Sequence, residues 1–225
     1  MKKYVMMAAT LALAGTIASA HEGDYGLLVQ GGKVVTGIAD DVTGAVTDLG
    51  TRVFGAELED NGTFWEAGEP GVFIPAASLP DNTQVSFTIE AALRYWDGTG
   101  PVNFSTIPAE QMTLGFGPET RLTPTSDSDV AGFSILYDAD APGGFDEHFD
   151  FLVPGSASAG IYLLQMRFSL SGFEDSDSVW TVFNAGLDDT LHDAAIDYVA
   201  ATYVPAPGAL ALLGFGGVLA GRRRR

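Results

Sequence analysis

Short runs in which apolar and polar residues alternate recur through the middle of the chain. The strongest covers residues 162–170, and residues 85–95 repeat the pattern. Because side chains of a β-strand point alternately to opposite faces, these runs predict half-buried strands. Gly31-Gly32 lies between two apolar triplets, which predicts a two-residue hairpin turn.

Turn-forming residues separate the alternating runs, and the 225 residues include 28 Gly and 11 Pro. We therefore expect an all-β fold, an antiparallel β-sandwich that forms a single body over residues 21–203. The end of this body has a helical pattern. Asp188 and Asp189 suit a helix start, an apolar stripe follows, and Pro205 ends it. This pattern predicts one C-terminal amphipathic helix near residues 188–203.

Residues 1–20 have the pattern of a secretory signal peptide. Lys2 and Lys3 precede an apolar run, and Ala18-Ser19-Ala20 has small residues at the positions that a signal peptidase reads. Cleavage after Ala20 would leave His21 as the first residue of the mature protein. We therefore expect export across the inner membrane.

Residues 204–225 differ in pattern from the body. Val204, Pro205, Ala206, Pro207 and Gly208 open the segment, an apolar run follows, and Arg222, Arg223, Arg224 and Arg225 end it. As a helix the apolar run is roughly 20 Å long, shorter than the ~30 Å hydrocarbon core of a bilayer. The terminal arginines would stay on the cytoplasmic side. The segment predicts a short transmembrane sorting helix that anchors the protein transiently.

This tail resembles the PEP-CTERM sorting domain of Gram-negative bacteria in its Val-Pro-x-Pro-Gly form, with Ala206 where the name-giving triplet has Glu. The resemblance implies processing by an exosortase-like enzyme and delivery to the cell surface or the exopolysaccharide matrix. It covers only the tail. The overall layout also resembles uncharacterised proteins of this sorting class, which implies no activity for the body.

Charge and composition limit what the body does. Without the two ends, five basic residues remain against 29 acidic ones, a charge of about −24. This charge argues against nucleic acid as a partner, because phosphate binding needs a basic face. The chain has no Cys, which excludes disulfides and thiolate metal sites. It also lacks the common hydrolase, metalloprotease and nucleotide-binding motifs, so we expect a non-catalytic surface or matrix protein.

An acidic segment leaves calcium binding open. Residues 138–150 offer the carboxylates of Asp138, Asp140, Asp146 and Asp150, and calcium prefers oxygen ligands. The segment departs from an EF-hand loop at Pro142 and Phe149. An ordinary turn rich in Asp, Pro and Gly explains it equally well.

The three histidines leave copper or zinc binding open. A mature N-terminal His21 offers both an α-amino nitrogen and an imidazole nitrogen, and His148 or His192 would complete the copper arrangement called a histidine brace. The alternative is that all three histidines are solvent-exposed and bind nothing. A further alternative is a carbohydrate-binding sandwich whose aromatic rings stack on sugars, with Trp65, Tyr95, Trp96 and Trp180 as candidates. Such residues more often belong to the core, and Trp65 and Trp96 are the two whose neighbouring Gly and Asp residues also suit loops.

Overall fold

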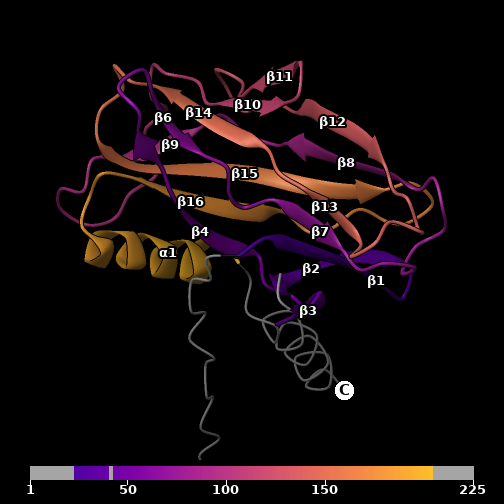
Figure 1. The fold of residues 1–225 in the computed structure, drawn as a ribbon. Helices are drawn as coiled ribbons and strands as arrows, with labels where there is room; N and C mark the ends of the chain where they lie inside the picture. The colour runs from indigo at the N-terminus through magenta and orange to yellow at the C-terminus, as the bar shows by residue number, and fades with distance from the viewer. Residues whose placement is uncertain (1–22, 41–42, 205–225) are drawn as a thin grey trace, which may run out of the picture.

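The computed structural model describes residues 23–40 and 43–204 (Figure 1). The predicted signal peptide and its cleavage residues Ala18, Ala20 and His21 lie outside the described residues, as does the predicted tail from Pro205 to Arg225. The strands, in chain order, are β1 Tyr25–Gln30, β2 Lys33–Asp40, β3 Ala45–Thr47, β4 Val53–Glu57, β5 Glu59–Asp60, β6 Phe64–Ala67, β7 Val72–Ile74, β8 Gln84–Ile89, β9 Arg94–Trp96, β10 Thr113–Phe116, β11 Glu119–Leu122, β12 Val130–Leu136, β13 Phe145–Glu147, β14 Asp150–Pro154, β15 Gly160–Leu170 and β16 Val179–Ala185. One helix, α1, covers Asp189–Tyr203.

The strands form three sheets. Sheet I has the order β13-β7-β1-β2-β3, and sheet II has the order β11-β10-β14-β6-β5. Sheet III has the order β12-β8-β15-β16-β4, with β9 paired to β15. The all-β class is confirmed, and within residues 23–40 and 43–204 the one helix follows the strands as predicted.

The prediction of an antiparallel fold is wrong for two strand pairs. β1 pairs in parallel with β7, and β16 pairs in parallel with β4. Both pairs join strands that are far apart in the sequence, so no local turn dictates their direction, and the alternation within each strand is the same for either direction. The predicted strand over 85–95 is also divided, because the chain leaves the sheet after Ile89 and re-enters as β9.

The main core lies between sheet III and the pair formed by sheets I and II. The ring of Tyr25 in sheet I is 5.0 Å from that of Phe168 in sheet III, and Phe151 in sheet II is 4.9 Å from Phe183 in sheet III. This packing gives a sandwich-like arrangement. The predicted inward face of β15 is confirmed, since all five of its apolar residues are buried, namely Tyr162, Leu164, Met166, Phe168 and Leu170.

Helix α1 covers the outer face of sheet III (Figure 1). Asp188 caps it by accepting a hydrogen bond from the Thr190 amide, as its position in the sequence predicts. Ala195, Ile196 and Val199 pack in a second apolar cluster with Trp180 and Val182 of β16. Because β16 is covered on both faces, all seven of its residues are buried. Among the described residues, no helix combines the length and apolar character needed to cross a bilayer.

Candidate metal centre

Sheets I and II meet at an irregularity in one long antiparallel strand pair. β6 continues into β7, and β13 continues into β14. Ala67 pairs with Phe151, and Val72 pairs with Glu147. Between these two pairs, the four residues 68–71 face the three residues 148–150, as in a β-bulge. A bulge re-aims side chains next to it, and two ionisable side chains, Glu69 and His148, lie at this one.

Asp24 brings a third ionisable group to the same place. It directly precedes β1, and the parallel pairing of β1 with β7 places it beside residue 71. The Tyr25 amide donates to the Gly71 carbonyl at 2.9 Å, and the Gly71 amide donates to Asp24 Oδ1 at 2.5 Å. Asp24 is only 2% exposed. Its carboxylate therefore forms a fixed floor for the site.

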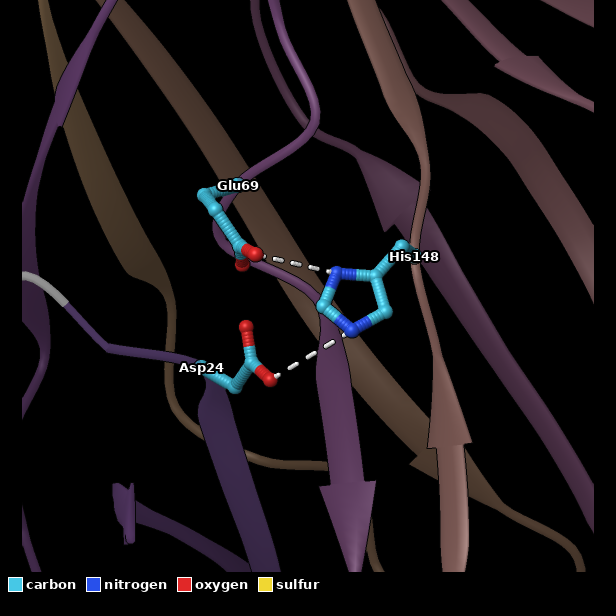
Figure 2. Close-up of side chains that lie close together, drawn as sticks. All are labelled: Asp24, Glu69 and His148. Carbon is cyan, nitrogen blue, oxygen red and sulfur yellow. Dashed lines mark ion pairs between the residues drawn. The ribbon is translucent and has the colours of Figure 1, made fainter. Parts of the chain in front are cut away.

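Glu69 and His148 complete what we call the Asp24–Glu69–His148 cluster (Figure 2). His148 Nδ1 lies 3.3 Å from Glu69 Oε1, and Nε2 lies 3.9 Å from Asp24 Oδ2. Asp146 adds a carboxylate oxygen 3.2 Å from Nε2. The His148 side chain is 45% exposed and that of Glu69 is 62% exposed. The cluster therefore has a buried floor and a side open to solvent.

The backbone also contacts the ring of His148. Its Nδ1 lies 3.3 Å from the Gly68 carbonyl oxygen, which accepts a hydrogen bond when Nδ1 carries a proton. Nε2 lies on the side of Asp24 and Asp146. Gly71 makes room for the ring, because a Cβ at that position would lie 2.9 Å from His148 Nδ1.

The electrostatics of the cluster reflect crowded negative charge. Burial, and then hydrogen bonding to Glu69, raise the pKa of the Asp24 carboxyl to about 6, against the opposing effects of the Gly71 amide and His148. Burial by itself lowers the pKa of the His148 imidazole, but Glu69 and Asp24 outweigh it and raise that pKa above its ordinary value. Burial also raises the pKa of the neighbouring Glu147 carboxyl. Several carboxylates thus share one cation, the imidazolium, when His148 is protonated.

The donor set suits a divalent transition metal. One ligand atom from each of the three residues lies within 4.8 Å of the others. Two ligands of one zinc ion, each about 2.1 Å from it, are at most about 4.2 Å apart. Small rotations of the exposed Glu69 and His148 side chains would close this difference. The imidazole nitrogen favours zinc or copper over calcium, which prefers oxygen ligands alone.

Comparison with known proteins gives no assignment for this site. No protein-family model and no functionally characterised protein matches the sequence. The resemblance of the tail to a sorting domain therefore stays a prediction.

The structure separates His192 from this cluster. His192 lies on α1, 8% exposed, beneath the helix on the outer face of sheet III. Its Nε2 donates to the Val182 carbonyl at 2.8 Å, and its Nδ1 lies 2.9 Å from Glu57 Oε1. Both ring nitrogens are engaged, so His192 is neither a solvent-exposed helix residue nor a free ligand. Of the histidines considered from sequence, His148 alone is placed by the structure in a cluster of potential ligands, while His21 lies outside the described residues.

The acidic segment is not gathered into one site. Asp138 and Asp140 lie in the turn between β12 and β13, where the Asp140 amide donates to Asp138 Oδ1 at 2.9 Å. Asp146 lies in β13 beside His148, and Asp150 lies in β14 opposite Gly115. In residues 23–40 and 43–204, the Asp24–Glu69–His148 cluster is the single group of three potential side-chain ligands.

The aromatic residues considered for sugar binding are also divided. Trp96 belongs to β9 and is buried with the apolar residues under α1, so it is a core residue, the more common role of such aromatics, and does not lie on a loop. Trp65 belongs to β6 and is partly buried against the main core.

Sequence reasoning missed Asp24 and Glu69. Neither has a local signature in a chain with 29 acidic residues. The one available signal for Glu69 was Glu69-Pro70-Gly71, whose Pro and Gly are typical of a turn, within a segment otherwise suited to strands. Nothing local marks Asp24, because its burial depends on the parallel pairing of β1 with β7.

Proposed function

We propose that the protein is an exported surface or matrix protein whose β-sandwich body binds a divalent transition-metal ion through Asp24, Glu69 and His148. One observation carries this proposal. Three segments far apart in the sequence bring a carboxylate, a second carboxylate and an imidazole within 4.8 Å of one another. The fixed, buried carboxylate of Asp24 is the anchor of the set.

Charge balance favours a metal over a simple ion pair. A single imidazolium offers one positive charge to Asp24, Glu69 and Asp146. The carboxylate of Asp24 is also removed from water, which is costly without full compensation. A divalent ion would neutralise both Asp24 and Glu69 while His148 binds as the neutral ring. Metal-bound imidazole commonly donates its other N–H to a carbonyl, and the Gly68 carbonyl is in place for this.

Export and surface sorting belong to the same proposal. Their support is the sequence of the two ends. Signal peptidase and an exosortase-like enzyme would be the processing partners, and exopolysaccharide is a candidate binding partner in the matrix. Mass spectrometry of the protein from the surface fraction should give a chain that starts at His21 and lacks Arg222–Arg225. Recovery of a chain ending at Arg225 would contradict processing of the tail.

Calorimetric titration with zinc tests the metal site. The mature protein should bind one zinc ion, and a double variant, Asp24→Asn with Glu69→Gln, should lose that binding. The matched control is Asp138→Asn with Asp140→Asn, which removes the same charge from a turn outside the cluster. Equal loss of binding in both double variants would show only general attraction to an acidic protein and would contradict the proposed site.

A further inference from the structure

We infer that a cavity at the junction of sheets I and III binds the carboxylate group of a small, singly charged organic acid, with Arg52 and Lys33 as its cationic partners. The cavity has a volume of about 80 Å³, against roughly 10 to 15 Å³ for one water molecule, so a carboxylate group fits inside. The site is separate from the proposed metal centre. Lys33 pairs with Gln30 at one end of the β1–β2 hairpin, whereas Asp24 lies at the other end.

The starts of three strands bring the charged side chains together. Lys33 is the first residue of β2, Arg52 directly precedes β4, and Asp177 lies two residues before β16. Because β4 and β16 pair in parallel, both begin at the same end of sheet III, where the Trp180 amide donates to the Arg52 carbonyl at 2.8 Å. Lys33, Arg52 and Asp177 all line the cavity.

The walls of the cavity are tied to the edge of β2. The Val34 amide donates to the Glu174 carbonyl at 2.9 Å, and the Gly50 amide donates to the Thr36 carbonyl at 2.8 Å. Val34, Thr36 and Gly50 line the cavity between these two bonds. Backbone hydrogen bonds therefore hold the site in shape.

Arg52 is a cation without an acidic partner in the described part of the chain. The other four basic residues of the body each form an ion pair with a carboxylate, namely Lys33, Arg94, Arg121 and Arg167. In residues 23–40 and 43–204, no carboxylate forms one with Arg52. The chain has 29 acidic residues, so an unpaired guanidinium that lines a cavity points to a negative partner from outside the chain.

Two contacts hold the guanidinium of Arg52 in place. Its Nε donates to the Ser178 carbonyl at 2.8 Å, and its central carbon lies 5.1 Å from the centre of the Trp180 ring. Neither contact uses the Nη nitrogens, which carry most of the N–H donors of the group. Two parallel N–H bonds from one edge of a guanidinium are a common way to bind a carboxylate.

The charges at the cavity favour a singly charged ligand. Lys33 Nζ lies 2.7 Å from Asp177 Oδ1, and this hydrogen bond, together with the charges of Lys33 and Arg52, lowers the pKa of the Asp177 carboxyl. Two cations and one anion leave a net charge of +1, which one carboxylate balances. A doubly charged phosphate or a polyanionic chain would bring excess negative charge to a body that already carries about −24.

Titration with sodium glucuronate, followed by NMR of the ¹⁵N-labelled mature protein, tests this site. The protein is first freed of metal on a chelating resin, so that the carboxylate has no ion to bind at the Asp24–Glu69–His148 cluster. We expect the amide signals of residues 33–36, 50–52 and 177–178 to shift. Glucose and sodium chloride at equal concentration should leave them in place.

Three variants identify the residues that bind. Arg52→Gln should weaken glucuronate binding about tenfold or more, because the carboxylate loses a charged, bidentate partner. Lys33→Gln, at a partly exposed position, should weaken it as well and does not disturb the contact of Arg52 with Trp180. The matched control is Arg94→Gln, which removes the same charge from an ion pair with Asp127 and should bind normally.

Asp177→Asn distinguishes a binding site from a structural ion pair. The substitution frees Lys33 and raises the net charge of the three side chains, so glucuronate should bind several-fold more tightly. Unchanged binding in both Arg52→Gln and Lys33→Gln would overturn the inference, as would signal shifts that sodium chloride reproduces. The zinc titrations depend on other residues, so this inference and the proposed metal site fail independently.

Discussion

Two histidines of this protein face carboxylates in opposite kinds of environment. His192 lies beneath α1, where Val182 and Glu57 engage its two ring nitrogens at 2.8 and 2.9 Å. His148 lies at the bulge between sheets I and II, where its contacts to Glu69, Asp146 and Asp24 are 3.2 to 3.9 Å and nearly half of the side chain is exposed. The short, buried contacts of His192 serve the fold. The longer, open contacts of His148 leave room for an ion.

The comparison shows that a nearby carboxylate does not by itself make a histidine functional. Both histidines have one. They differ in burial and in the length of their contacts, because both ring nitrogens of His192 have short, buried partners whereas the ring of His148 is open to solvent. This difference arises from tertiary structure.

Substituting each histidine by Ala is the strongest way to break the comparison. We expect His148→Ala to abolish detectable zinc binding and to change the free energy of unfolding of the metal-free protein little. We expect His192→Ala to bind zinc normally but to lose about 1 to 3 kcal/mol of stability, because the buried Val182 carbonyl loses its donor. Zinc titration and urea unfolding of both variants check this. The comparison is contradicted if His192→Ala loses zinc binding while His148→Ala keeps it, or if His148→Ala is the more strongly destabilised variant.

Asp24→Asn should separate binding from stability. At pH 8 the ionised Asp24 destabilises the metal-free fold, because its pKa is raised from 3.8 to about 6. An Asn side chain keeps the acceptor for the Gly71 amide and removes the charge. We expect zinc affinity to fall at least tenfold. The metal-free protein should gain stability, at most about 3 kcal/mol for a pKa shift of about two units at Asp24. If the metal-free Asp24→Asn variant is less stable at pH 8 than the unsubstituted protein, the buried charge of Asp24 does not destabilise the fold.

The pH dependence of metal-free and zinc-bound protein should have opposite signs. The raised pKa values of Asp24 and His148 mean that the folded protein binds protons more tightly than the unfolded chain. The stability that these groups contribute is therefore present at low pH and is lost as pH rises through about 6 and then through the pKa of His148. Zinc competes with the same protons, so its affinity should rise over that range. Thermal unfolding at pH 5 to 8, with and without zinc, should show the two trends. If stability falls with rising pH both with and without zinc, zinc and protons do not compete for the same side chains.

The smallest expected effect concerns the two glycines beside the cluster. A Cβ at Gly71 would lie 2.9 Å from His148 Nδ1 and 3.0 Å from the Glu147 carbonyl oxygen, whereas none of the described atoms lies within 4 Å of a Cβ at Gly68. Gly71→Ala should therefore displace the ring and weaken zinc binding several-fold, and Gly68→Ala should leave it unchanged. Zinc titration of the two variants is the check. Equal affinities would mean that the position of the ring is not important for binding.

Local pattern was enough to predict several elements of this fold, although it missed short strands such as β6 and β13. Period-two alternation predicted β15, Gly31-Gly32 predicted the β1–β2 turn, and Asp188 predicted the start of α1. The two parallel pairs were not predictable, because they join segments far apart in the chain. Burial of Trp96 also depends on distant elements, since α1 covers it only in the folded chain.

The candidate site was predictable only in part, and for the same reason. His148 was identified because histidine is rare in this chain, with three in 225 residues. Asp146 was among the acidic candidates, but Asp24 and Glu69 were not, because Asp24 reaches the ring through a parallel pairing and Glu69 through an extra residue at a bulge. The sequence pattern favoured Asp138 and Asp140, which are close together in the chain but lie in a turn away from the ring.

The most direct test of the central claim is a crystal structure of the mature protein grown with zinc, with anomalous diffraction recorded at the zinc absorption edge. The account predicts one strong anomalous peak between Asp24, Glu69 and His148, about 2.0 to 2.2 Å from an imidazole nitrogen and a carboxylate oxygen of each acidic residue. A peak confined to residues 138–150, or a cluster with its present distances and no peak at saturating zinc, would contradict it.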